Sequence, residues 1–193
     1  MAGAAMREAP RRLPDAETGA RVKALADAPP RDMSLLRDEV TKAHARGWAL
    51  TTLGGKVPNR KGWQAETPLP LADLLKHVDR RGNIGVRTGT ASGVSVIDED
   101  GADSAFLAEL PKTATAITGS GHLHFYFQHA PELRNSAGTM APKIDVRADG
   151  GQIVLPGSYH PDTGEQYRWK EGHSPEDIPL APFPIHLLPK PEP

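Results

Sequence analysis

Three short segments of this sequence alternate polar with apolar side chains. Because successive residues of a strand point to opposite faces, each segment predicts a strand with one polar and one apolar face. If the three strands are neighbours in one sheet, their polar faces combine into a single site. The polar sets are Asp98 with Asp100 in residues 94–100, His122 with His124 and Tyr126 in residues 122–127, and Lys143 with Asp145 and Arg147 in residues 143–147.

These side chains suit metal-dependent phosphoryl transfer. Clustered carboxylates repel one another and tolerate proximity only when cations are present. Hard oxygen ligands select Mg²⁺ or Mn²⁺ over zinc, and two such ions about 3.5–4 Å apart can clamp the attacking and leaving oxygens of a phosphoryl displacement. Histidine and arginine would bind phosphate oxygens. We therefore expect Asp98, Asp100 and Asp145 to hold two divalent ions.

Two glycine-containing turns flank these segments. Residues 118–121, Thr-Gly-Ser-Gly, precede the histidine segment, and their glycines would let backbone N–H groups approach an anion. Residues 148–151, Ala-Asp-Gly-Gly, have the composition of a tight hairpin turn. We expect this turn to pair the Asp145 strand with an apolar strand at 152–155, and we expect Asp149 to be a turn residue rather than a ligand.

Short elements separated by many turns predict an α+β fold. Ser34 is the expected N-cap of a helix that runs towards Gly47. Further helices are expected at 71–78 and 102–110, and strands at 48–53, 85–87, 94–98, 114–118, 122–128, 143–147, 152–155 and 167–169.

The sequence divides into three expected parts. Residues 1–32 are expected to form a peripheral or flexible segment with one short helix at 17–28, which ends at two prolines. Residues 33–172 form the predicted domain that carries the site. Residues 173–193 form a proline-rich tail, and the seven prolines in residues 175–193 predict an extended conformation.

Composition narrows the class of protein. The chain has 193 residues, 38% of them hydrophobic, and a formal net charge of -1. It has no apolar run of about 20 residues that could span a membrane, and because residues 1–17 have no long apolar core we expect no secretory signal there. The absence of cysteine excludes disulfides and thiolate zinc sites. We expect a cytoplasmic protein without zinc and without a membrane partner, whose basic groups act in a local groove.

The three segments resemble, in order and spacing, the motifs of the bifunctional DNA primase/polymerase (prim-pol) N-terminal domain family of the archaeo-eukaryotic primase superfamily. That family carries hDxD or hDxE, then sxH, then hD, where h is hydrophobic and s is small. The corresponding residues here are 97–100 (Ile-Asp-Glu-Asp), 122–124 (His-Leu-His) and 144–145 (Ile-Asp). The resemblance runs from about residue 34 to residue 169 and includes the flanking segments 54–58, 61–63, 83–86, 88–89, 118–121 and 145–151. His122 departs from the pattern, because it occupies the small position.

This resemblance implies a primase-polymerase catalytic core, with an RRM-like sheet and an N-terminal α/β unit. It implies template-dependent DNA synthesis, and primer synthesis, by two-metal phosphoryl transfer onto a 3′-hydroxyl. Asp98, Asp100 and Asp145 would hold Mg²⁺ or Mn²⁺, and His124 would act with them by contacting the phosphates of the nucleotide. The further candidates for nucleotide binding are His122, Ser120, Arg147 and Lys56. The implied partners are a single-stranded DNA template or primer-template, nucleoside triphosphates and a separate replicative helicase, because relatives often carry a helicase downstream.

Two other functions are compatible with parts of the pattern. The His122-Leu-His124 triplet is also found in HUH-type rolling-circle replication endonucleases, in which a tyrosine, here Tyr159 or Tyr167, would attack DNA. That interpretation leaves the aspartate motifs unexplained. The second alternative is a non-catalytic module that binds nucleotides or single-stranded DNA. Asp145 could also simply pair with Arg147, and His160 and His173 support no functional prediction.

Overall fold

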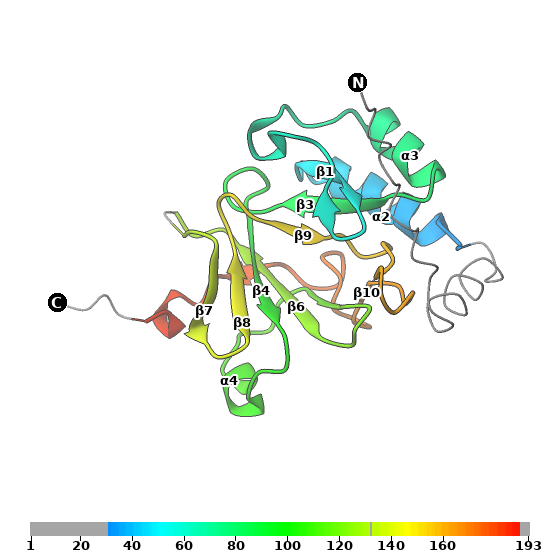
Figure 1. Cartoon of the computed structure of the whole chain (residues 1–193). Coiled ribbons are helices and arrows are strands. Elements are labelled where there is room, and N and C mark those ends of the chain that lie inside the picture. The colour runs from blue at the N-terminus through cyan, green and yellow to red at the C-terminus, as the bar shows by residue number, and fades with distance from the viewer. Residues whose placement is uncertain (1–30, 132, 190–193) are drawn as a thin grey trace, which may run out of the picture. The chain divides into compact units, whose positions relative to one another are not determined.

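Two β-sheets form the framework of the described residues, which are 31–131 and 133–189 of this computed structural model (Figure 1). The four-stranded sheet has the strand order β2-β1-β3-β9 and is antiparallel throughout. Its strands are β1 (Leu50–Gly54), β2 (Val57–Pro58), β3 (Asn83–Arg87) and β9 (Gln152–Val154).

The seven-stranded sheet carries the three polar segments. Its order is β10-β5-β6-β4-β8-β7, with antiparallel neighbours, and β11 runs parallel to the end of β6. Strands β6, β4 and β8 are adjacent, so the prediction that the three segments are neighbours in one sheet is confirmed. The strands are β4 (Val94–Glu99), β5 (Thr115–Ile117), β6 (Leu123–Gln128), β7 (Ser136–Ala141), β8 (Ile144–Arg147), β10 (Arg168–Trp169) and β11 (Ala181–Pro182).

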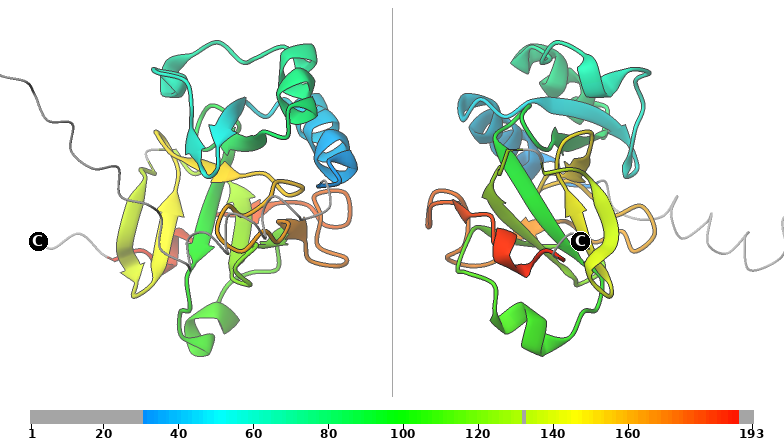
Figure 2. Two further views of the ribbon diagram at one scale, coloured as in Figure 1. Left: turned by 45° about the vertical axis from the view of Figure 1, so that its right-hand side comes forward. Right: turned by 90° about the vertical axis from the view of Figure 1, so that its left-hand side faces the viewer.

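Helices cover the four-stranded sheet and the far end of β4. α2 (Ser34–Ala45) and α3 (Leu71–Asp79) pack against each other and against β1 (Figures 1 and 2). α4 (Ser104–Ala108) follows β4, and two short 3₁₀ helices are η1 (Trp63–Ala65) and η2 (Ile185–Leu187). The predicted α+β class is confirmed. None of these helices, in the part of the chain that the structure describes, has the length and apolar character to cross a membrane.

Two details at the N-terminal side differ from, or fall outside, the predictions. Ser34 is the first residue of α2 rather than its N-cap. The backbone N–H of Ser34 donates a hydrogen bond to the carboxylate of Asp32 at 2.9 Å. Residues 1–30, which include the predicted helix at 17–28 and most of the predicted peripheral segment, lie outside the described residues.

The two faces of the seven-stranded sheet contact different cores. The Asp98 face, which also carries Val94, Val96 and Tyr126, packs against α2, α3 and the four-stranded sheet. The opposite face, called the Phe127 face, packs against α4 and η2. Each strand therefore anchors both of its faces, and the polar site occupies one end of a face whose other end is apolar core.

The predicted hairpin at 148–151 is wrong. β8 pairs with β4 and β7, whereas β9 pairs with β3 in the four-stranded sheet, so this turn carries the chain from one sheet to the other. A second crossing, at 88–93, lies against it: Thr88 N–H donates to the carbonyl of Gly151 at 3.0 Å, and Thr90 N–H donates to Asp149 Oδ1 at 2.7 Å. Asp-Gly-Gly composition predicts the turn but not the partner of the next strand, which depends on the rest of the fold.

Part of the proline-rich segment packs against the seven-stranded sheet. Ala181 pairs with Phe127 on β6, and the Phe183 side chain is 5% exposed with its ring centroid 5.6 Å from that of Phe127. The segment is extended at β11 but also contains η2, so the prediction of an extended conformation holds only for part of it. The apolar residues between its prolines cover the Phe127 face. The expected domain boundaries themselves remain predictions.

Candidate active site

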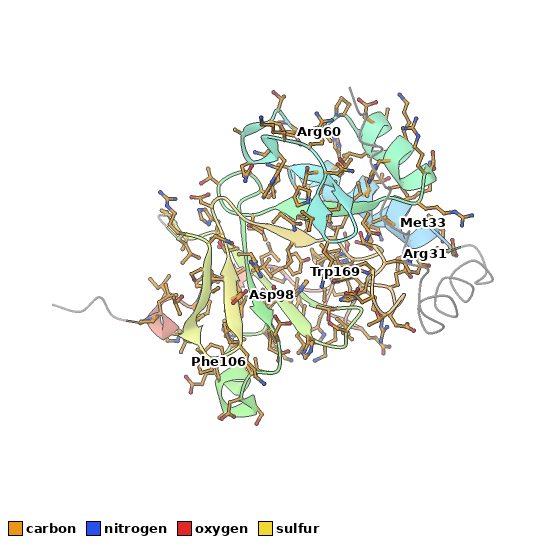
Figure 3. All side chains as sticks on the ribbon, viewed as in Figure 1. Arg31, Met33, Arg60, Asp98, Phe106 and Trp169 are labelled. Carbon is orange, nitrogen blue, oxygen red and sulfur yellow. The ribbon has the colours of Figure 1, made fainter. Side chains whose placement is uncertain are left out.

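The strand register aligns the predicted catalytic side chains across three strands. Asp98 on β4 lies opposite His124 on β6 and opposite Asp145 on β8. Residues that face one another across antiparallel strands have their side chains on the same side of the sheet, about 4.5–5.5 Å apart at Cβ. Asp100 lies two residues beyond Asp98 and is exposed. Together with Arg147, these residues form what we call the acidic end of the site (Figure 3, in which Asp98 is labelled).

Asp98 is the most enclosed of these carboxylates. Its side chain is 13% exposed, His124 Nε2 lies 3.2 Å from its Oδ1, and the Arg147 guanidinium donates to its Oδ2 at 3.1 Å. Burial by itself would raise the pKa of Asp98, but the hydrogen bond and charge of His124 and the charge of Arg147 outweigh it. The pKa of Asp98 is therefore held below its ordinary value, and the carboxylate is ionised at neutral pH.

Arg147 bridges two carboxylates and keeps donors for a ligand. Its Nη2 donates to Asp98 at 3.1 Å and to Asp145 at 2.8 Å, and its Nε lies 3.3 Å from Asp98. Asp145 therefore does pair with Arg147, as the sequence allowed, but the same guanidinium also pairs with Asp98. The two N–H groups on Arg147 Nη1 make no hydrogen bond among the described residues, and the side chain is 29% exposed. A guanidinium in this position can bind a phosphate while it stabilises the carboxylates.

The acidic end has the donor set of a magnesium or manganese site. All its carboxylates offer hard oxygen atoms, and an oxygen that accepts one hydrogen bond keeps a second lone pair for an ion. Within residues 31–131 and 133–189, no three Asp, Glu or His side chains already converge closely enough to hold one metal ion. Arg147 supplies the positive charge between Asp98 and Asp145 in this arrangement, so ion binding would require these side chains to rotate.

Glu99, which separates the two aspartates in the sequence, has a different role. It is buried on the Phe127 side of β4, as strand alternation predicts. Its carboxylate accepts hydrogen bonds from the backbone N–H groups of Gly101, of Ala102 at 2.8 Å and of Leu123 at 3.2 Å. It therefore fixes the loop after β4 to the start of β6 and is not directed towards the site.

A pocket of about 270 Å³ lies between the two sheets and extends away from the acidic end. One wall comes from β4, β6 and β8, and the opposite wall comes from β9 and the turn between β1 and β2. Asp145 does not line the pocket itself, but it accepts a hydrogen bond from Arg147, which does. The lining residues are Lys56, Asp98, Asp100, Thr118, Ser120, His124, Arg147, Gln152, Ile153, Val154, His160 and Tyr167.

The other end of this pocket, called the donor end, is formed by Lys56, Ser120 and His160. Lys56 Nζ lies 3.3 Å from His160 Nε2. The Ser120 hydroxyl lies 3.0 Å from that of Thr118, which already accepts a hydrogen bond from the N–H of His122 at 2.9 Å. These groups lie on three turns, and they offer an ammonium, an imidazole and a hydroxyl group to one volume.

Close packing joins two of these turns. A Cβ atom on Gly119 would lie 2.4 Å from Cβ of His160 and 2.6 Å from the carbonyl oxygen of Glu165, so only glycine fits there. The Thr163 hydroxyl donates to the carbonyl of Gly119 at 2.8 Å. The glycine loop at 118–121 is thus placed by contact with the turn that follows β9, in addition to any anion it binds.

Tyr167 lies between the two histidines of the pocket. Its ring centroid is 5.9 Å from that of His124 and 5.9 Å from that of His160. Burial, together with the negative charges of Asp98 and Asp100, raises the pKa of Tyr167 far above its ordinary value. The phenol therefore stays protonated and is a poor nucleophile. Tyr159 donates its hydroxyl to the carbonyl of Asp32 at 2.9 Å and does not line the pocket.

Strand alternation fails for two of the predicted polar residues. β6 begins at Leu123, and His122 lies beside Glu99, with Nδ1 3.9 Å from Oε2. His122 does not line the pocket, so the geometry gives no support to its expected part in nucleotide binding. Lys143 lies in the turn between β7 and β8 with φ of 62°, where a strand pattern cannot position it.

The sequence did not predict several pocket residues. Of the expected candidates, Asp98, Asp100, His124, Arg147, Ser120 and Lys56 line the pocket. His160 was missed as a binding residue because it lies beside a turn, and Tyr167 was missed because it precedes the two-residue strand β10, which is too short for a periodic pattern to mark the side chain. Gln152 and Val154 lie on β9, and their position on the pocket wall depends on the crossing between sheets that the hairpin prediction missed.

Comparisons with known proteins give matches of two kinds. The sequence model of the family described as "Bifunctional DNA primase/polymerase, N-terminal" matches residues 41–185. Among solved structures, the AEP domain of the primase-polymerase (PrimPol) of cyanophage S-2L is similar at 16% sequence identity and a TM-score of 0.48, over 79% of this chain and 98% of that chain. No curated protein sequence matches. The matched residues 41–185 include every residue that lines the pocket.

Proposed function

Because this chain belongs to the family of bifunctional DNA primase/polymerase N-terminal domains, we propose that it is a template-dependent nucleotidyltransferase that adds nucleotides to a 3′-hydroxyl and synthesises primers. The observation that carries the proposal is the register of Asp98 with His124 and Asp145 on three adjacent strands. It places two carboxylates and a histidine on one face, beside a pocket with basic groups.

Asp98, Asp100 and Asp145 are the proposed ligands of two Mg²⁺ or Mn²⁺ ions. Such ions would lower the pKa of the primer 3′-hydroxyl and neutralise the charge of the triphosphate. The depressed pKa of Asp98 keeps this carboxylate ionised. The strands beneath it are packed on both faces, so the carboxylates are held on a rigid support.

His124 and Arg147 are the proposed contacts to the phosphates near the reacting centre. Both side chains line the pocket and both touch Asp98. His124 Nδ1 is buried without a hydrogen-bond partner among the described residues, and Arg147 Nη1 is also without one there. The N–H groups on Arg147 Nη1 thus retain hydrogen-bonding capacity that a phosphate oxygen would use. The donor that His124 would offer to a phosphate is the Nε2–H that now faces Asp98.

The proposed partners follow from the reaction and, for the helicase, from the family resemblance. They are a single-stranded DNA template or primer-template, nucleoside triphosphates and a separate replicative helicase. With a net charge of -1, the chain would bind DNA through local basic groups rather than through its overall charge.

The geometry disfavours the nicking alternative. Tyr167 is 3% exposed and has a raised pKa, and the hydroxyl of Tyr159 is hydrogen-bonded away from the pocket. His122 and His124 contact different carboxylates, Glu99 and Asp98, rather than converging on one point. A non-catalytic module would leave the aligned aspartates without a role.

The test is incorporation of labelled nucleotide on single-stranded DNA, with and without an annealed primer, in Mg²⁺ and in Mn²⁺. The Asp98→Ala/Asp100→Ala double variant is the inactive comparison, and Asp73→Ala, an exposed carboxylate on α3, is the matched control. We expect metal-dependent products from the wild type and the control but not from the double variant. Products without an annealed primer would establish priming.

Two outcomes would contradict the proposal. Synthesis that survives in the double variant would remove the metal assignment. If the wild type gives no product in either metal, a tyrosine-linked DNA adduct would indicate a nicking enzyme, and DNA binding alone would indicate a non-catalytic module.

A further inference from the structure

His160 is held in one protonation state by its own turn. Its Nδ1 lies 3.2 Å from the backbone nitrogen of Asp162 and 3.3 Å from that of Thr163, and both of these N–H groups donate to it. A ring nitrogen that accepts hydrogen bonds carries no proton, so in neutral His160 the proton lies on Nε2. Burial, followed by the charge of Lys56, lowers the pKa of His160, which favours this neutral form.

This tautomer leaves two donors facing each other. His160 Nε2 carries a proton and lies 3.3 Å from the Lys56 ammonium, which can only donate. No acceptor of the described residues lies between these two groups. His160 is 5% exposed and lines the pocket. A pair of donors directed at one another in a pocket is complementary to an anion that accepts from both.

The surroundings supply further donors and little negative charge. The Ser120 hydroxyl lines the same pocket, and Thr163 and Gly119 hold the two turns together. The carboxylate nearest to His160 is that of Asp162, whose Oδ2 is 4.0 Å from Nδ1, on the turn side of the ring and 69% exposed. Tyr167 separates His160 from His124, which contacts Asp98.

We infer that His160 and Lys56 form a second phosphate subsite, which binds the phosphates of the incoming nucleotide that lie farthest from the aspartates, and that this pair selects triphosphates over monophosphates. The inference rests on the proposed function for the identity of the ligand. His160 donates its Nε2–H to a phosphate oxygen, and the Lys56 ammonium binds the same group. The N–H of the neutral imidazole fixes the orientation of the bound phosphate, and the ammonium attracts its negative charge.

Two substitutions separate this role from the structural role of the turn. In His160→Asn the side-chain oxygen can take the place of Nδ1 and accept the two backbone N–H groups, but the donor at Nε2 is lost. In His160→Gln the amide nitrogen can reach the place of Nε2 and donate, but the acceptor for the turn is lost. A residue that only stabilised the turn would tolerate asparagine and be damaged by glutamine.

The experiment measures binding of inorganic tripolyphosphate, pyrophosphate and orthophosphate to the metal-free full chain by calorimetry, with thermal unfolding of each variant. We expect the wild type to bind tripolyphosphate most tightly. His160→Asn should weaken that binding roughly tenfold to hundredfold without a lower unfolding temperature. His160→Gln should retain most of the affinity, and Lys56→Met should lose affinity with no change in stability.

The inference is overturned if His160→Asn binds tripolyphosphate like the wild type, or if the three anions bind equally. It is also overturned if only His160→Gln loses affinity, together with stability, because that pattern marks a turn residue. Failure of the proposed function would look different: tripolyphosphate would still bind in a His160-dependent way while the wild type made no DNA product.

Discussion

The two ends of the pocket are built in different ways. The acidic end stands on adjacent strands, where the register sets Asp98 opposite His124 and Asp145. The donor end stands on three turns, and it is positioned by side-chain-to-backbone hydrogen bonds and by the close approach of Gly119 to His160. A strand ladder places side chains by a repeating pattern, whereas a turn is placed by contacts that no repeat describes.

Because of this difference, substitutions at the two ends should affect different properties of the protein. A polar substitution at the acidic end leaves the ladder intact, so it should remove activity with little effect on folding. An added methyl group at Gly119, where the two turns of the donor end touch, moves a turn, so it should affect ligand affinity and stability together. The first three predictions below each test one side of this contrast, and the fourth tests the junction between the sheets beside it; they start with the largest expected effect.

Asp145→Asn should lower kcat by at least roughly 1,000-fold, because a proposed ion ligand is lost while the side chain keeps its shape. The unfolding temperature should change by no more than about 2 °C, since one partly exposed ion pair with Arg147 contributes little. Steady-state incorporation and thermal unfolding measure the two effects, with Asp73→Asn as control. More than about a tenth of wild-type activity in Asp145→Asn would exclude it as a ligand.

Arg147→Lys should lower kcat/KM roughly 10- to 100-fold. The guanidinium bridges Asp98 and Asp145 and keeps Nη1 for a ligand, whereas an ammonium offers a single point of contact. Arg37→Lys, at the ion pair between α2 and α3, is the matched control. If kcat/KM is unchanged, the guanidinium fork has no part in phosphate binding and serves only the two carboxylates.

Gly119→Ala should raise the KM for nucleotide about tenfold and lower the unfolding temperature by a few degrees, with a smaller effect on kcat. The new Cβ would lie 2.4 Å from Cβ of His160 and 2.6 Å from a carbonyl oxygen, so the two turns must separate. Gly54→Ala is the control, because its nearest neighbour would lie at an ordinary 3.9 Å. A fall in kcat with an unchanged KM would show that the donor end affects the chemical step rather than nucleotide binding.

Asp149→Asn tests the crossing between the sheets and should have the smallest effect. The backbone N–H of Thr90 and then the charges of His129 and Arg134 hold the pKa of Asp149 below its ordinary value. A lowered folded-state pKa gives stability that is present above the unfolded-state pKa and is lost as the pH falls through the folded-state value. The variant should therefore unfold roughly 2–4 °C below the wild type at pH 7, and the difference should shrink as the pH falls through the lowered pKa of Asp149.

Thermal unfolding between pH 2 and pH 8 checks this prediction, with Asp73→Asn as the reference. A difference that stays constant through the acid range would mean that the charge of Asp149 contributes nothing and that only the side-chain shape matters.

The sequence was sufficient to predict the acidic end because the information there is local. Alternation in β4, β6 and β8 placed Asp98, His124 and Asp145 on one face, and the structure has these strands as neighbours. The same rule failed at His122 and Lys143, which lie just outside the strands that were expected to contain them. Alternation ends where the ladder ends, and a boundary shift of one residue is enough to redirect a side chain.

The donor end depended on non-local contacts that no local pattern contains. His160 acquires its environment from Lys56, which is 104 residues away in the sequence. The hairpin prediction at 148–151 failed for the same reason, because Asp-Gly-Gly composition describes a turn and not the sheet that the chain enters next. The two-residue strands β2 and β11 and the six-residue strand β7 were missed because their pairing depends on neighbours already in place rather than on their own residues.

Two neighbouring chain crossings between the sheets, from β3 to β4 and from β8 to β9, have a consequence for how quickly a ligand can enter. Residues 88–93 and 148–151 are joined by hydrogen bonds from Thr88 and Thr90, and a Cβ on Gly89 would lie 2.6 Å from the Asp149 backbone. This junction holds the sheets together beside the pocket and restricts their movement relative to each other. We therefore expect nucleotide binding to follow a single kinetic phase, limited by diffusion and side-chain rotation, with no slow opening step before it.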